Sequence, residues 1–112
     1  RGIPVFLHAH GDNVEDWKAL LAVAADSATP PALVLTHQTP EEIEGVHNPG
    51  GFTDGDRAAC IVRSLGVPVD RIRMLGTRTD VVGRWSGKTD PVRKLEKLGW
   101  MEKVLVRLGL DF

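Results

Sequence analysis

Short apolar segments alternate with stretches of helical periodicity along this chain of 112 residues. Residues 3–7 and 32–35 are apolar runs of strand length, and the segment from Val14 has apolar side chains at helical spacing. A third strand is predicted over residues 71–75, after a helical stretch at 54–65. Strands separated by helices join through right-handed crossovers into a parallel sheet covered on both faces. The sequence therefore predicts an α/β fold: three layers, with a mostly parallel, Rossmann-like sheet and flanking helices.

Helix ends are marked by capping residues. Gly66 follows the helix predicted over residues 54–65, in the position where a left-handed residue ends a helix. Asp90 and Pro91 open the last helix, because a capping carboxylate followed by proline suits a first turn. The predicted buried face of that helix consists of Val92, Leu95, Leu98, Met101 or Glu102, Leu105 and Leu108.

The composition is that of a soluble globular domain. Hydrophobic residues make up 42% and charged residues 26%, and the net charge is −1. A near-neutral chain has no electrostatic reason to bind nucleic acid or a membrane surface. No apolar stretch approaches the length of a membrane span. The single Cys60 cannot form an internal disulfide, which fits a reducing cytoplasm.

The first predicted strand begins almost immediately after Arg1. This start predicts that residues 1–112 are a single α/β domain of catalytic type and the C-terminal part of a larger protein. Strand edges that such a truncation exposes favour pairing between copies, so a homodimer is expected.

Four polar clusters fall near the ends of the predicted elements. Residues 8–13 follow the first strand, 36–39 the second and 76–80 the third, while residues 50–57 begin a helix. In parallel sheets ligands bind beyond the carboxyl ends of the strands, and the starts of the helices open on the same edge. The sequence therefore predicts that the four clusters share one ligand site.

The segment from Gly50 to Arg57 is predicted to hold a magnesium nucleotide. Asp54 and Asp56 are carboxylates of the kind that ligate hard cations, and Arg57 suits phosphate oxygens. A helix start also presents unpaired N–H groups and a partial positive charge. The alternative is structural, a helix cap followed by an acid in the first turn. Further residues expected to contact the nucleotide here are Gly50, Gly51, Thr53 and Gly55.

The polar segment after the first strand permits three interpretations. His8, His10 and Asp12 alternate in a pattern close to the zinc-binding signature of metallo-β-lactamase-like hydrolases, although Asn13 stands where that signature has another histidine. Alternatively, Asp12 and Asn13 bind magnesium or nucleotide, and Gly11 permits close approach of the ligand. In the third interpretation His8 is a strand-end residue, and Asp12 or Asn13 caps the following helix.

Other polar and aromatic residues have both a binding and a structural interpretation. His37 and Gln38 can hydrogen-bond the edge of a heterocycle or be solvated in a loop. Phe52 can stack on a heterocycle or pack in the core. Lys88 resembles the lysine of a phosphate-binding loop, but Val82 stands where that motif requires glycine. Lys88 is therefore expected to meet a phosphate only as a point charge.

Two of these motifs resemble a known family. The segments 8–13 and 51–57 look like those of the archaeal 6-hydroxymethylpterin diphosphokinases, whose catalytic domain is similar to that of thiamin pyrophosphokinase. Residues 36–39 between them, Gly76 after the third predicted strand and the pair Gly87-Lys88 agree with the same pattern. The resemblance spans essentially the whole chain.

The resemblance implies a Mg²⁺-dependent, cytoplasmic enzyme that transfers diphosphate from ATP to the hydroxymethyl group of a dihydropterin and releases AMP. In such a reaction the protein chiefly positions the substrates and neutralises charge. The residues expected to carry it are Asp12, Asp54 and Asp56 at magnesium, Arg57 and the Gly50–Gly55 amides at phosphates, and Gln38 and Asn13 at a base.

Two other function classes remain open from the sequence. One is a nucleotide-binding or pterin-binding half-domain that is inert by itself. The other is a zinc-dependent hydrolase built on the His8–Asp12 pattern. AMP release on addition of a pterin distinguishes the diphosphokinase from the binding module, and stoichiometric zinc in the purified protein indicates the hydrolase.

Overall fold

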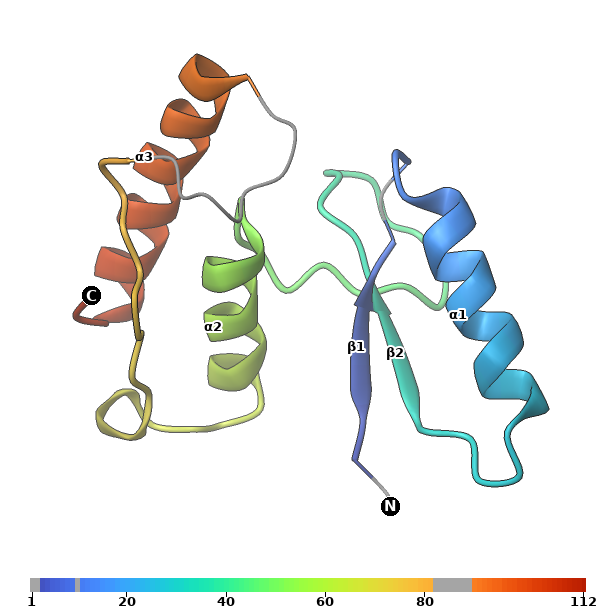
Figure 1. The fold of residues 1–112 in the computed structure, drawn as a ribbon. Coiled ribbons are helices and arrows are strands. Elements are labelled where there is room, and N and C mark those ends of the chain that lie inside the picture. Colours follow the sequence, from blue (N-terminus) through green and yellow to red (C-terminus); the bar gives the residue numbers. More distant parts are fainter. Residues whose placement is uncertain (1–2, 10, 82–89) are drawn as a thin grey trace. The chain divides into compact units, whose positions relative to one another are not determined.

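The computed structural model describes residues 3–9, 11–81 and 90–112. The chain divides into two compact units, an N-terminal unit (residues 1–48) and a C-terminal unit (residues 49–112). The expectation of one catalytic domain over the whole chain stays a prediction. In chain order the elements are β1 (Val5–His8), α1 (Val14–Asp26), β2 (Leu33–Thr36), α2 (Asp54–Ser64), the 3₁₀ helix η1 (Val69–Arg71) and α3 (Pro91–Leu108) (Figure 1).

The N-terminal unit is built on a parallel pair of strands joined by α1 (Figure 1). Val5 pairs with Leu33 and His8 with Thr36, and hydrogen bonds extend the ladder at both ends. The predicted parallel pairing is therefore confirmed. The strands begin two residues (β1) and one residue (β2) later than the apolar runs predicted. Each strand also ends one residue later than predicted, because the ladder includes the polar residue that follows each run.

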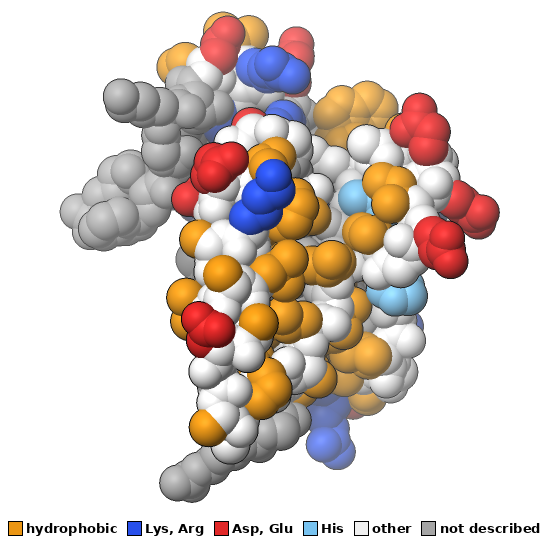
Figure 2. Space-filling model, turned by 90° about the vertical axis from the view of Figure 1, so that its right-hand side faces the viewer, with side chains coloured by type: hydrophobic (Ala, Val, Ile, Leu, Met, Phe, Trp, Pro, Cys, Tyr) orange, Lys and Arg blue, Asp and Glu red, His pale blue; other side chains and the backbone are white. Residues whose placement is uncertain are grey.

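Helix α1 packs loosely on the strands. Only Ala24 of its residues is fully buried, and an apolar cavity of about 190 Å³ lies between the helix and the sheet. Leu20 and Val23 are exposed, and Figure 2 shows hydrophobic side chains gathered over the face of the molecule that includes α1. Among the described residues the outer edge of β1 has no strand partner. Self-association through such an edge stays a prediction.

The third predicted strand, residues 71–75, is wrong. Arg71 ends η1, and the residues after it pair with no strand in the described part of the chain. Ile72 and Met74 instead pack against helices of the C-terminal unit, while Leu75 is 89% exposed. An extended segment on a helical core alternates just as a strand does, so the pattern is the same. The structure is mixed α/β, and the three-layer Rossmann-like sheet is not confirmed.

The C-terminal unit has its own hydrophobic core, in which α2 packs against α3. Asp90 caps α3 by accepting hydrogen bonds from the N–H groups of Val92 (2.9 Å) and Arg93 (3.4 Å), and Pro91 is the first helical residue. Gly109 ends the helix with a left-handed φ of 77°. The predicted start of α3 is therefore confirmed. The buried residues of this core are Ala59, Leu98, Met101, Leu105 and Leu110.

None of the helices in residues 3–9, 11–81 and 90–112 is both long and apolar enough to cross a membrane.

Replacing the cap of α3 tests this account of the helix start. We expect Asp90→Ala to lower the free energy of unfolding of the C-terminal unit by about 1 kcal/mol, because two N–H groups lose their acceptor. Urea denaturation followed by circular dichroism measures the loss. Asp90→Asn is the matched control, since asparagine caps equally well. Equal midpoints for the alanine variant and the native protein would contradict the assignment.

Candidate functional site

The four polar clusters meet in two pairs, one pair in each unit. In the N-terminal unit the ends of β1 and β2 lie side by side, and His8 Nδ1 hydrogen-bonds to the buried Thr36 hydroxyl. Asn13 Nδ2 donates to the His8 carbonyl oxygen at 3.0 Å. The described residues of the first cluster (8, 9 and 11–13) and residues 36–39 therefore share one end of the strand pair, where parallel sheets bind ligands.

The first polar cluster differs from its prediction in one respect. Asn13 occupies the N-cap position of α1, but its side chain makes no capping hydrogen bond. Its Nδ2 instead donates to the His8 carbonyl oxygen. The prediction that the Asn13 side chain caps the helix is therefore wrong. Gly11 and Asp12 are exposed and remain accessible to a ligand. The zinc interpretation falls partly on His10, which lies outside the described residues, and those residues contain no group of three or more metal-binding side chains.

The chain after β2 folds back onto the end of the sheet. The His37 N–H donates to the His47 carbonyl oxygen and the His47 N–H to that of Leu35, each at 2.9 Å. A tight turn between them is closed by the Val46 N–H on the Ile43 carbonyl oxygen, with Gly45 at a φ of 76°. These backbone hydrogen bonds make the segment between β2 and residue 48 an ordered loop.

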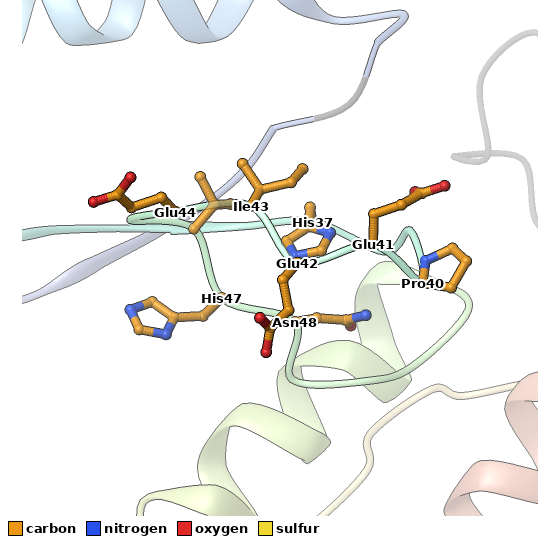
Figure 3. A pocket seen from close by; sticks show the side chains of 9 residues that line it. His37, Pro40, Glu41, Glu42, Ile43, Glu44, His47 and Asn48 are labelled. Carbon is orange, nitrogen blue, oxygen red and sulfur yellow. The ribbon is translucent and has the colours of Figure 1, made fainter.

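This loop lines an open cavity of about 630 Å³, whose lining side chains are shown in Figure 3. His37 lines the cavity and is only 7% exposed, with its Nδ1 held by Thr39. Gln38, which the sequence assigned to a base, is exposed and does not line it. Binding of a base by Gln38 stays a prediction. The lining consists of His37, Pro40, Glu41, Glu42, Ile43, Glu44, Val46, His47 and Asn48.

In the C-terminal unit, a glycine turn leads into α2. Gly50 and Gly51 have φ values of 95° and 92°, which side chains other than glycine rarely adopt. A Cβ atom on Gly51 would lie 2.7 Å from the backbone N and Cα of Arg57. The turn therefore requires glycine for close packing against α2, whether or not a ligand binds there.

Asp56 is the structural centre of this turn. Its carboxylate accepts hydrogen bonds from the N–H groups of Phe52 (2.7 Å) and Thr53 (2.6 Å) and from the Thr53 hydroxyl (2.6 Å). The side chain is 0% exposed. Thr53 and Asp56 form a capping box, so the N-cap is Thr53 and not Asp54. Its buried and occupied carboxylate gives no support to the predicted catalytic and metal-binding roles of Asp56.

Asp54 and Arg57 form an ion pair at 3.5 Å, but their environments are opposite. The Arg57 side chain is 1% exposed, whereas that of Asp54 is 88% exposed. A guanidinium so buried does not reach a phosphate in this arrangement, and the predicted phosphate contact of Arg57 is therefore not supported. Asp54 projects into solvent from the first residue of α2 and is accessible to a metal ion or substrate.

A second cavity, of about 400 Å³, lies at the start of α2. It brings residues 50–57 together with residues 76–80, the two clusters that belong to this unit. The helix start contributes a partial positive charge. Lys94 and Arg78 contribute side-chain charge, and threonine side chains contribute hydroxyl groups. The lining consists of Thr53, Asp54, Gly55, Gly76, Thr77, Arg78, Val81, Lys94, Leu98 and Met101.

Lys94 is the cavity residue that sequence reasoning missed, because lysines of α3 are typical of a solvated helix face. A signal was nevertheless present: Lys94 precedes Leu98 by four residues and Met101 by seven, on the stripe that forms the buried face. A lysine on the same helix face as core residues packs its methylene groups beside them and extends its ammonium group past the end of the core. For Lys94, the cavity at the start of α2 lies at that end of the core.

Arg78 and Asp80 pair at the rim of this cavity. The guanidinium donates to both carboxylate oxygens, at 2.8 and 2.7 Å. These hydrogen bonds lower the pKa of Asp80 to about 2 and raise that of Arg78. Asp80 therefore holds the arginine in one orientation, as two-point carboxylate pairs do.

Phe52, Cys60 and Lys88 are the remaining residues of interest near the start of α2 or in the predicted phosphate site. Phe52 stacks on Trp100, with ring centroids 5.5 Å apart, so one face of its ring is occupied by protein. Burial, followed by the charge of Asp56, raises the pKa of the Cys60 thiol. Lys88 lies outside the described residues, and its phosphate contact stays a prediction.

Sequence comparison identifies two archaeal relatives. The chain is 41% identical over 81 residues to the 6-hydroxymethyl-7,8-dihydropterin pyrophosphokinase of Pyrococcus furiosus. It is 31% identical over 118 aligned positions to the protein of the same name from Methanothermobacter thermautotrophicus. The chain is a homologue of these pyrophosphokinases. The resemblance seen in its motifs is thereby confirmed.

The similarity covers most of this chain but a minor part of each relative. It includes 71% of the chain and 31% of the Pyrococcus protein, and 92% of the chain and 47% of the Methanothermobacter protein. The chain thus spans less than half the length of these curated relatives. No protein-family model matches it, and no solved structure matches it.

The glycine turn gives a test of local packing. We expect Gly51→Ala to lower the free energy of unfolding of the C-terminal unit by at least about 1 kcal/mol, because the new Cβ atom meets the Arg57 backbone at an unfavourable φ. Gly55→Ala is the matched control, since its Cβ atom would meet only side-chain atoms, at 3.9 Å, inside a helix. Urea titration compares the two variants. A midpoint for Gly51→Ala equal to that of Gly55→Ala would overturn the packing argument.

Proposed function

We propose that the chain is a diphosphokinase that transfers diphosphate from ATP to 6-hydroxymethyl-7,8-dihydropterin and releases AMP. The observation that carries the proposal is the cavity at the start of α2, which combines an exposed carboxylate with positive charge in a homologue of proteins named as pyrophosphokinases. Because the chain spans less than half of those relatives, activity, substrates and partners are all part of the proposal.

The cavity supplies the groups that a polyphosphate requires. The first N–H groups of α2, next to Gly55, point out of the helix start, where anions are favoured. Lys94 adds a mobile ammonium group, and Arg78 adds a guanidinium held by Asp80. The hydroxyls of Thr53 and Thr77 line the same space. We assign the diphosphate being transferred to this cavity.

Magnesium fits this site through Asp54. Its carboxylate is exposed at the cavity wall, and magnesium in nucleotide sites usually takes one or two carboxylates together with phosphate oxygens. In the N-terminal unit, Asp12 is also exposed and stays a proposed ligand. When bound, the ion would neutralise charge on the β- and γ-phosphates. Asp56 is left out of the ligand set because it is buried.

The proposed reaction balances without any redox partner. The oxygen of the pterin hydroxymethyl group bonds to the β-phosphorus of ATP, and the bond from that phosphorus to the oxygen bridging to the α-phosphorus breaks. AMP carries away the bridging oxygen and its electron pair, and the hydroxyl proton passes to a base or to solvent. Asp54, as the exposed carboxylate of the cavity, is our candidate to orient that hydroxyl.

Adenine nucleotide analysis tests the proposal. The chain is mixed with ATP, Mg²⁺ and 6-hydroxymethyl-7,8-dihydropterin, and nucleotides are separated by chromatography. We expect AMP to appear only when the pterin is present. ADP in its place would mean a different phosphoryl transfer and would overturn the mechanism. ATP-analogue binding with no AMP release would favour the binding module.

Neutralising Asp54 tests its role. We expect Asp54→Asn to reduce turnover by at least about a hundredfold, the usual size of a lost acid–base or charge contribution. Asp70→Asn is the matched control, because Asp70 is exposed on η1 and does not line the cavity. AMP formation is the readout for both. Turnover of Asp54→Asn within twofold of the native chain would leave Asp54 without a catalytic role.

Removing the Lys94 charge tests the phosphate assignment. We expect Lys94→Met to raise the KM for ATP by about tenfold, as loss of a hydrogen bond to a charged group predicts. Lys97→Met is the matched control, since Lys97 is on α3 but does not line the cavity. Initial rates at varied ATP concentration give both constants. Equal KM values for ATP in the two variants would show that the triphosphate does not contact Lys94.

A further inference from the structure

The cavity of the N-terminal unit differs in charge from the cavity at α2. Its charged side chains are the carboxylates of Glu41, Glu42 and Glu44, and no lysine or arginine is among the residues that line it. A triphosphate brought there would be repelled by three like charges. The lining therefore favours a neutral or cationic ligand with hydrogen-bond donors.

His37 adds a buried donor to this lining. The Thr39 backbone N–H donates to His37 Nδ1 at 3.3 Å, which makes Nδ1 an acceptor. A neutral imidazole that accepts at Nδ1 carries its proton on Nε2. Within the part of the chain that the structure describes, the side-chain hydrogen bonds of His37 are all made with Thr39. The Nε2–H group of a side chain more than nine-tenths buried is thus available to the cavity that it lines.

Hydrogen bonds order the loop that carries these groups. The bridge between Thr36 and His47 fixes its two ends, and Asn48 Nδ2 donates to the Thr39 carbonyl oxygen at 3.0 Å. Figure 3 shows His37 and Glu42 in the middle of the lining; in this view the Glu42 side chain extends away from the His37 ring, and the Glu44 side chain lies at the opposite end of the lining from Glu41. The His37 imidazole is held by Thr39, and the exposed Glu42 carboxylate, on the same ordered loop, is able to turn toward a ligand in the cavity that both residues line.

A donor–acceptor pattern of this kind has a specific complement. A carboxylate accepts two parallel hydrogen bonds from adjacent N–H groups, and Nε2–H requires an acceptor beyond them. The edge of a 2-amino-4-oxopyrimidine presents an amino group, a ring N–H and a carbonyl oxygen in that order. Guanine presents the same edge, so the pattern selects this class of heterocycle, and the proposed function selects the pterin within it.

We propose that this cavity binds the aminopyrimidinone edge of the pterin acceptor. Glu42 accepts hydrogen bonds from the 2-amino group and the ring N–H, and His37 Nε2–H donates to the 4-oxo group. The assignment rests on the proposed function for the identity of the acceptor. The sequence motifs assigned no glutamate to a binding role. This proposal assigns recognition of the pterin acceptor to the loop after β2.

Direct binding without ATP tests this assignment separately from catalysis. The full chain is titrated into 6-hydroxymethylpterin, and ligand fluorescence reports the Kd. The second ligand is 6-hydroxymethyllumazine, in which a carbonyl group replaces the 2-amino group. We expect the native chain to bind the pterin at least about tenfold more tightly, because lumazine places an acceptor against the carboxylate.

Four variants identify the residues responsible. We expect Glu42→Gln to weaken pterin binding by about tenfold or more and to narrow the preference over lumazine, because a glutamine amide can donate to the 2-oxo group. Glu15→Gln is the matched control and should leave both affinities unchanged, because Glu15 is exposed on α1 and does not line the cavity. Glu44→Gln shows whether a second glutamate of the lining takes the place of Glu42. His37→Asn retains an acceptor at the place of Nδ1 but lacks Nε2–H, and we expect it to weaken binding of both ligands by about 2- to 10-fold. Circular dichroism verifies that each variant is folded.

The outcomes separate this inference from the proposed function. Pterin binding that depends on Glu42 and His37, with no AMP release, would support the cavity assignment and overturn the enzymatic proposal. AMP release that is unaffected by Glu42→Gln and His37→Asn would do the reverse. A native chain that binds pterin and lumazine equally, or that loses binding in Glu44→Gln rather than Glu42→Gln, would overturn the assignment.

Discussion

The buried carboxylate of Asp56 is the interaction on which the candidate phosphate site depends. Both of its oxygens are hydrogen-bonded to the chain just before α2, so the helix start and the glycine turn form together. A charge buried without such partners would be strongly unfavourable, which makes these bonds obligatory. The packing of Gly51 against Arg57 closes the other side of the turn. The consequence is a fixed helix start, with Asp54 outside and Asp56 inside.

The two cavities divide the chemistry by charge. The one at α2 combines a helix start, Lys94 and Arg78, and is suited to anions. The one formed by the loop after β2 contains three glutamates and a buried imidazole, and is suited to a neutral ligand rich in N–H groups. A diphosphokinase needs both kinds of environment, because its two substrates are a polyanion and an uncharged heterocycle. Under the proposed function, the opposite charges would also disfavour binding of either proposed substrate in the other cavity.

Local signals predicted the helices well. Asp90-Pro91 and Gly66 specify helix ends through hydrogen bonds and backbone angles within one turn. Helix α2 has the expected bounds to within a residue, and α3 begins where it was expected to begin. The third strand failed for a different reason. Ile72 and Met74 alternate as strand residues do, but whether an extended segment pairs with a strand or lies on helices depends on distant residues. Asn13 occupies the N-cap position, but its side chain makes no capping bond, and its Nδ2 donates to the His8 carbonyl oxygen, a partner outside the helix.

By itself, the sequence determined where helices begin and which archaeal proteins the chain resembles. It also identified the two segments, 8–13 and 50–57, that are richest in potential ligand-binding side chains. Each of these depends on residue identity and on neighbours within a few positions. Only the tertiary structure decided that Asp54 is accessible while Asp56 is buried, and that Lys94 reaches a cavity. It also decided that the glutamates after β2 line a cavity with His37. The reason is that burial is set by contacts between residues far apart in the chain, such as Thr53 with Met101, which no local pattern records.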